Sequence, residues 1–133
     1  MHPIAKKNAL LQVQTTRTQA VQQATVTRTK ALAEVNEARS AAAREAAAKR
    51  GDILVRTEQM RKAAAALPLP IQAAVLSETE QLRRAVFAQT EQAVKAVFER
   101  TEAFLNQVAI RSEAAVRDVF TQTEALLKKL GAA

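Results

Sequence analysis

The pattern of apolar and polar positions repeats every 11 residues through the second half of the chain. Residues 77–131 can be aligned as five copies: SETEQLRRAVF, AQTEQAVKAVF, ERTEAFLNQVA, IRSEAAVRDVF and TQTEALLKKLG. Each copy has Thr or Ser at its third place, Glu at its fourth, and Val or Leu at its tenth. Three turns of an α-helix take about 10.8 residues, so this period keeps equivalent places on nearly the same face of one long helix.

That face is an apolar stripe with hydroxyl residues along its midline. Its places lie within roughly 130° of the helix circumference, the width of a core-facing stripe. Buried hydroxyls there would specify the register between helices, as buried polar groups do in coiled coils; alternatively, they serve as compact residues that allow close approach. We predict that the stripe drives assembly and consists of Thr79, Leu82, Val86, Phe87, Thr90, Val94, Val97, Phe98, Thr101, Phe104, Leu105, Val108, Ser112, Val116, Val119, Phe120, Thr123, Leu126, Leu127 and Leu130.

The glutamates at the fourth place of each copy are expected in solvent, on the edge of the stripe. Most of them precede Arg or Lys by four residues, a spacing worth about 0.2–0.5 kcal/mol per pair in a helix. The pairs are Glu80–Arg84, Glu91–Lys95, Glu113–Arg117 and Glu124–Lys128. We interpret this column as a solvated salt-bridge edge, not as a set of catalytic carboxylates.

The first half of the chain has the same period with smaller apolar residues. One column contains Leu10, Val21, Leu32, Ala43 and Leu54, and a second lies beside it with Val13, Ala24, Val35 and Ala46. The small residues favour close packing of this apolar face against the Val- and Phe-bearing stripe of the second half.

A column of arginines accompanies these apolar columns. Successive members lie ~16.5 Å apart along a helix, and they are Arg17, Arg28, Arg39 and Arg50. The column is a candidate face for an acidic partner, although the aliphatic stems of arginines can equally cover a neighbouring helix. Residues 1–66 hold 12 Lys and Arg against 5 Asp and Glu, whereas residues 67–133 hold eight of each, so the excess positive charge lies in the first half.

The clearest break in the helical pattern is AALPLPIQ, at residues 65–72. Pro68 and Pro70 lack a donor and disfavour helix at the residue before them. They divide the chain into a basic, Ala-rich arm (1–66), a turn (67–70) and an arm with the five repeats (71–133). A second break at residues 51–52 would give three helices, but the apolar columns continue through it in phase, which favours one continuous helix.

Two arms of nearly equal length around a short turn predict an all-α fold. We expect a long antiparallel helical hairpin with 11-residue coiled-coil repeats. Because two helices bury little of their surface, the hairpin should assemble into a multi-helix bundle or a filament. The tip is unusually apolar: its side chains either contact a partner subunit or a membrane, or pack on the end of the hairpin. They are Leu67, Leu69 and Ile71.

Composition argues against catalysis. The chain has no Cys, Trp or Tyr and one histidine, His2, so neither a disulfide framework nor a histidine-based catalytic set can be assembled. No Gly-rich phosphate loop or metal-ligand cluster is recognisable. We therefore expect no enzyme, no cofactor and no small-molecule substrate. The start lacks a continuous apolar stretch and no apolar run approaches 18 residues, from which we expect a cytoplasmic or other reducing intracellular location.

Three functions fit these features, and a structural self-assembly protein, forming homo-oligomers, accounts for most of them. The 11-residue amphipathic period is similar to that of apolipoproteins, of the helical repeats of synucleins, and of phasins. That resemblance implies a helix lying on a membrane or particle surface. The third function is nonspecific nucleic-acid binding through the arginine column, although residues 1–66 contain no aromatic side chain for stacking on bases.

Overall fold

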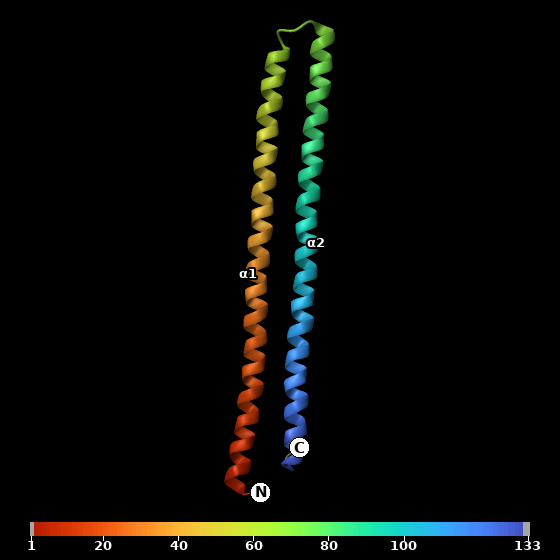
Figure 1. Cartoon of the computed structure of the whole chain (residues 1–133). Helices are drawn as coiled ribbons and strands as arrows, with labels where there is room; N and C mark the ends of the chain where they lie inside the picture. Colours follow the sequence, from red (N-terminus) through yellow and green to blue (C-terminus); the bar gives the residue numbers. More distant parts are fainter. Residues whose placement is uncertain (1, 132–133) are drawn as a thin grey trace. The chain divides into compact units, whose positions relative to one another are not determined.

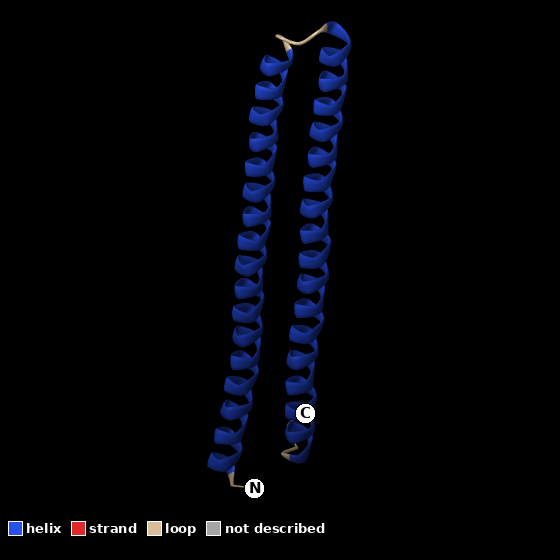
Figure 2. Cartoon of the chain, turned by 45° about the horizontal axis from the view of Figure 1, so that its top comes forward, coloured by secondary structure: helices blue, strands red, loops and turns tan. Residues whose placement is uncertain are grey.

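The computed structural model describes residues 2–131, which form two long α-helices and no strand. Helix α1 spans Pro3–Ala64 and helix α2 spans Leu69–Lys129. Figure 2 shows helix throughout this part of the chain, apart from its ends and one short connection. The prediction of an all-α chain is confirmed, and α1 runs through Gly51 without interruption.

The connection between the helices is short. The N–H of Leu67 donates to the carbonyl of Ala64 at 3.0 Å, which tightens the end of α1. Helix α2 begins at Leu69, two residues before the start suggested by the prolines, because Pro70 falls in the first turn, where an N–H has no intrahelical acceptor. At the other end of α2, Gly131 has a φ of 69°, the left-handed conformation that commonly terminates helices.

The chain divides into two compact units. The terminal unit contains residues 1–35 and 102–133, and the turn unit contains residues 36–101. In the turn unit, the end of α1 and the start of α2 lie side by side as an antiparallel helical hairpin, coloured from orange-yellow through green to cyan in Figure 1. In the terminal unit, the red start of α1 packs antiparallel to the blue end of α2.

Each unit is held by a core of small residues. Helix α1 contributes buried side chains from two columns, and α2 contributes its midline hydroxyls. The buried apolar residues are Val13, Ala24 and Ala31 with Val35 in the terminal unit, and Ala46, Ile53 and Ala64 in the turn unit. Alanine and valine let two helices approach closely, so this core is thin and excludes the largest side chains.

One column predicted to face α2 does not. Leu10, Val21, Leu32 and Leu54 are 36–51% exposed. In the terminal unit, Ala24 lies four residues before Arg28 and Leu32 lies four residues after it, so the two flank the arginine column on opposite sides. Helix α1 turns the side of Ala24 toward α2, where Val13, Ala24, Val35 and Ala46 are buried, and leaves the leucine column exposed.

Candidate assembly surface

The midline hydroxyls of α2 are buried, and those of its four midline threonines donate to carbonyls of their own helix. Thr79, Thr90, Thr101, Ser112 and Thr123 are 2–7% exposed. The hydroxyl of Thr101 donates to the carbonyl of Val97 at 2.7 Å, and the other threonines donate likewise to a carbonyl three or four residues earlier. A hydroxyl whose proton is used in this way can still accept a hydrogen bond through its oxygen.

Three arginines of α1 provide that donor. In the terminal unit, Nε of Arg17 donates to Oγ1 of Thr123 at 2.6 Å. In the turn unit, the same bond joins Arg39 to Thr101 at 2.9 Å and Arg50 to Thr90 at 2.8 Å. A hydrogen bond with a charged donor contributes about 1.5–3 kcal/mol when buried, and less at partly exposed positions.

Each of these guanidinium groups also covers a phenylalanine ring one turn before the threonine. The guanidinium carbon lies 4.6 Å from the ring centroid for Arg17 and Phe120, 4.5 Å for Arg39 and Phe98, and 4.9 Å for Arg50 and Phe87. Such cation–π contacts contribute about 0.5–1 kcal/mol at exposed sites. We call each set of three residues an Arg–Thr–Phe layer. The layers join α1 to α2 at steps that follow the 11-residue period.

The fourth arginine has no such layer. In every layer, the residue numbers of Arg and Thr add to 140, and this register places Arg28 opposite Ser112 in the terminal unit. The position equivalent to the phenylalanine is occupied by Ala109. Arg28 is exposed, and among residues 2–131 its side chain makes no hydrogen bond, ion pair or cation–π contact.

The flanks of the predicted assembly stripe remain exposed within each unit. On one flank, Phe98 is 44% exposed and Phe120 is 36% exposed even with an arginine over each ring. On the other flank, Phe104 is 40% exposed and Leu126 is 43% exposed. The two units therefore bury the midline of the stripe and leave much of its apolar area uncovered, and assembly through that area stays a prediction.

The arrangement bears on the predicted acidic-partner face as well. The guanidinium groups of Arg17, Arg39 and Arg50 are engaged with α2, and Arg17 also lies 3.6 Å from a carboxylate oxygen of Glu124. Among the described residues 2–131, Arg28 is the member of the column whose guanidinium makes no such contact. Binding of an acidic partner to this column stays a prediction that rests mainly on Arg28.

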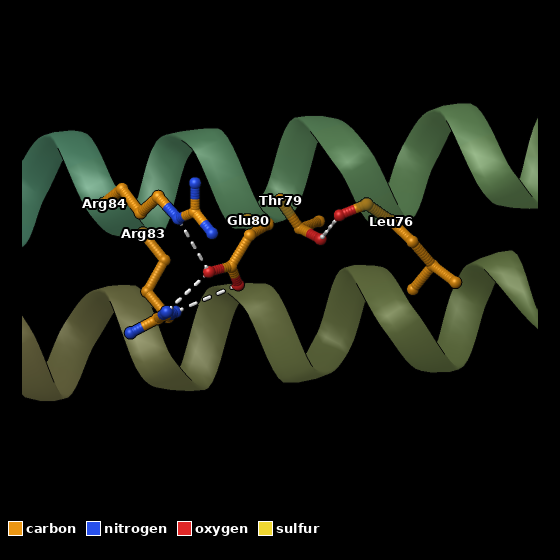
Figure 3. A network of polar contacts seen from close by, with 5 residues as sticks. All are labelled: Leu76, Thr79, Glu80, Arg83 and Arg84. Atoms are coloured by element: carbon orange, nitrogen blue, oxygen red, sulfur yellow. Dashed lines mark hydrogen bonds and ion pairs between the residues drawn. The ribbon is translucent and has the colours of Figure 1, made fainter.

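The glutamate edge forms fewer ion pairs than its spacing suggests. Within residues 2–131, the expected pair Glu80–Arg84 forms at 3.1 Å, whereas the corresponding pairs of the other copies do not. Glu80 also accepts two bonds from Arg83 (Figure 3). The hydrogen bonds from Arg83 have the largest effect on the pKa of Glu80. Together with the hydrogen bond from Arg84 and the charges of both arginines, they outweigh desolvation and lower that pKa to about 2. Arg83 in turn lies over the ring of Phe87, 5.5 Å from its centroid.

The apolar tip is exposed in the turn unit. Leu69 is 80% exposed, Ile71 is 50% exposed and Leu67 is 41% exposed. Packing of these side chains on the end of the hairpin and their contact with another surface both stay predictions. Neither helix, over the residues described, has an apolar stretch long enough to cross a bilayer, and this part of the chain has no group of three acidic, His or Cys residues that could hold a metal ion.

Sequence reasoning found the arginine and threonine columns but not their relationship. The shared period of 11 residues does indicate that the two columns can meet repeatedly in an antiparallel pair of helices. It does not indicate which arginine meets which threonine, because that register depends on the geometry of the turn.

No family model, curated protein or solved structure matches the chain. Its function is therefore inferred from the contacts and exposures of its own residues.

Proposed function

We propose that the chain is a structural self-assembly element, a non-catalytic scaffold, spacer or filament subunit whose helices join those of other copies in a multi-helix bundle. The observation that carries this proposal is that small side chains are buried while large apolar side chains are exposed, the reverse of what is usual in a folded protein. The cores of the two units consist of alanine, valine, isoleucine and hydroxyl residues, while large apolar side chains such as Phe98 (44%), Phe104 (40%) and Leu32 (51%) are exposed on their surfaces. Burial of such side chains is what normally drives association.

The exposed area supports the same conclusion. The chain exposes 9786 Å², whereas a compact monomer of 14.4 kDa exposes about 6,800 Å². The excess is on the order of 3,000 Å², and a standard protein interface buries about 800 Å² on each partner. The chain therefore has area for contacts with more than one neighbour, as a bundle or filament requires.

Light scattering coupled to size exclusion tests the proposal, over a range of protein concentrations and from low to high salt. We expect helical oligomers that persist at high salt, because apolar contacts are not screened. Circular dichroism alongside should show high helicity at every concentration that forms oligomers. A monomer at all concentrations, with weak helicity, would overturn the proposal.

A second candidate function is binding to a lipid or particle surface, and the exposed tip favours it. Leu67, Leu69 and Ile71 are held apart by two prolines that restrict the backbone. An apolar tip of this kind can enter the interface of a bilayer. Co-sedimentation with vesicles separates the candidates. Wild-type protein that pellets with vesicles, together with Leu69→Ser protein that stays in the supernatant and still oligomerises, would favour surface binding.

A further inference from the structure

The free arginine in the terminal unit lies on a surface with its own apolar and acidic borders. Arg17 reaches across to Phe120, so the arginine column and the phenylalanine column lie on the same side of this unit. Beyond the arginines lies the leucine column, with Leu32 four residues after Arg28. Beyond the phenylalanine column lies Glu113, four residues after Ala109. We call this surface, from Leu32 to Glu113, the arginine face.

The arginine face is both apolar and charged. Leu32 is 51% exposed and Val21 is 46% exposed. Arg28 and Glu113 are exposed too, and among residues 2–131 neither makes an ion pair. Because Ala109 stands where the other layers have phenylalanine, no hydrogen bond, ion pair or cation–π contact among residues 2–131 holds the Arg28 guanidinium against α2, and its long side chain can reach a group outside the unit.

We propose that the arginine face of the terminal unit binds a second copy of this chain, with Arg28 of each copy meeting Glu113 of the other. This inference rests on the proposed function and names the surface through which it acts. In a twofold contact, both copies use the same patch. A positively charged residue of that patch can therefore pair only with a negatively charged residue that the same patch contains. The arginine face meets this condition, because it carries Arg28 and Glu113, neither of which makes an ion pair among residues 2–131, beside exposed leucine and valine.

The apolar and charged groups have different roles in the contact. Burial of Leu32 and Val21 supplies the affinity. The reciprocal Arg28–Glu113 pairs supply the register, because a misplaced copy would bring like charges together, and such juxtapositions are strongly unfavourable at interfaces.

The surface is tested with two matched charge insertions, followed by sedimentation velocity over a range of concentrations. Leu32→Glu places a charge on the arginine face, and Val26→Glu places the same charge on helix α1 of the same unit, outside both the arginine face and the predicted assembly stripe, where the side chain is 59% exposed. We expect Leu32→Glu to weaken self-association at least about tenfold and Val26→Glu to change it by less than about threefold. Equal loss in both variants, or greater loss in Val26→Glu, would overturn the proposed face while self-assembly stands. A wild-type protein that stays monomeric overturns both proposals.

The reciprocal pair is tested by mixing. Arg28→Glu and Glu113→Arg should each weaken self-association about tenfold, whereas Lys30→Glu, the same change of charge two residues away and outside the face, should not. An equal mixture of the first two variants should regain wild-type association, because the glutamate introduced in one copy meets the arginine introduced in the other.

Recovery in the mixture can come only from contacts between copies, since within each variant the residues at positions 28 and 113 have like charges. A mixture as weak as its components would overturn the pair. The changed positions in these variants are exposed, so the substitutions should not disturb the fold. The mixing experiment therefore tests the contact between copies even if Leu32→Glu lowers helicity.

Discussion

Nε of Arg17 donates a hydrogen bond of 2.6 Å to Oγ1 of Thr123, although the two residues are 106 positions apart in the chain. The same contact recurs in the turn unit, where Arg39 and Arg50 meet Thr101 and Thr90. These repeated polar contacts specify which residue of one helix lies against which residue of the other. Apolar columns of uniform size specify that register poorly, because they can slide past one another with little change in packing.

The Arg–Thr–Phe layer should need the planar guanidinium and not simply a positive charge. Arg50→Lys is expected to lower the free energy of unfolding by about 1 kcal/mol, because an ammonium group cannot bond Thr90 and cover the ring of Phe87 together. Urea unfolding at low protein concentration measures the change. Arg56→Lys, at an exposed position of the same helix, is the control and should be neutral. An equal effect of both changes would mean that the layer contributes only charge.

The incomplete layer around Arg28 should accept the missing ring. Ala109→Phe is expected to raise the free energy of unfolding by about 0.5–1 kcal/mol through a contact with Arg28 like those of the other layers. Ala103→Phe, at an exposed position of α2, has the same cost in helix propensity and should lower stability slightly. Thermal unfolding of dilute protein gives both values. A lower melting temperature for Ala109→Phe than for Ala103→Phe would contradict the register that places Arg28 opposite Ser112.

The two glycines should respond to alanine in opposite directions. Gly51 lies inside α1, no atom lies within 4 Å of an added Cβ, and Gly51→Ala should stabilise the chain by about 0.5–1 kcal/mol. Gly131 has a φ of 69°, so Gly131→Ala should cost about 1 kcal/mol despite equally open space. Denaturant unfolding distinguishes the two. Loss of stability on Gly51→Ala would mean that α1 is interrupted there in solution.

The Glu80 cluster should make stability depend on pH in the acid range. The hydrogen bonds from Arg83 and Arg84 lower the pKa of Glu80 from 4.5 to about 2. The folded state therefore binds this proton less readily than the unfolded state, and the contribution of Glu80 is complete above pH 4.5 and is lost as the pH falls toward 2.

Comparison of wild type with Glu80→Gln isolates this contribution. The stability difference between them should be present at pH 7 and should shrink between pH 4.5 and pH 2. Because the cluster is exposed, high salt should reduce the difference at pH 7. Direct titration of the Glu80 carboxyl by NMR provides an independent check, and a pKa near 4.5 would show that the cluster does not persist in solution.

The amino-acid sequence by itself determines the helices, the turn and the face of α2 that is buried. An 11-residue period is nearly three whole helical turns, so Thr101 and its equivalents must share one line on any continuous helix. The prolines at 68 and 70 end one helix and open the next, because they have no N–H to donate to a helical hydrogen bond and so fit only its first turn. These are local consequences of backbone geometry, and each follows from neighbouring residues.

Only the tertiary structure decides which flank of the arginine column is buried and what the arginines touch. Ala24 and Leu32 lie at equal distances on either side of Arg28, and both are apolar, so periodicity cannot choose between them. The choice depends on the space left beside the hydroxyls of α2, and the contact between Arg17 and Phe120 depends on the register between helices. Both are properties of two surfaces brought together, and the pattern of either helix alone does not contain them.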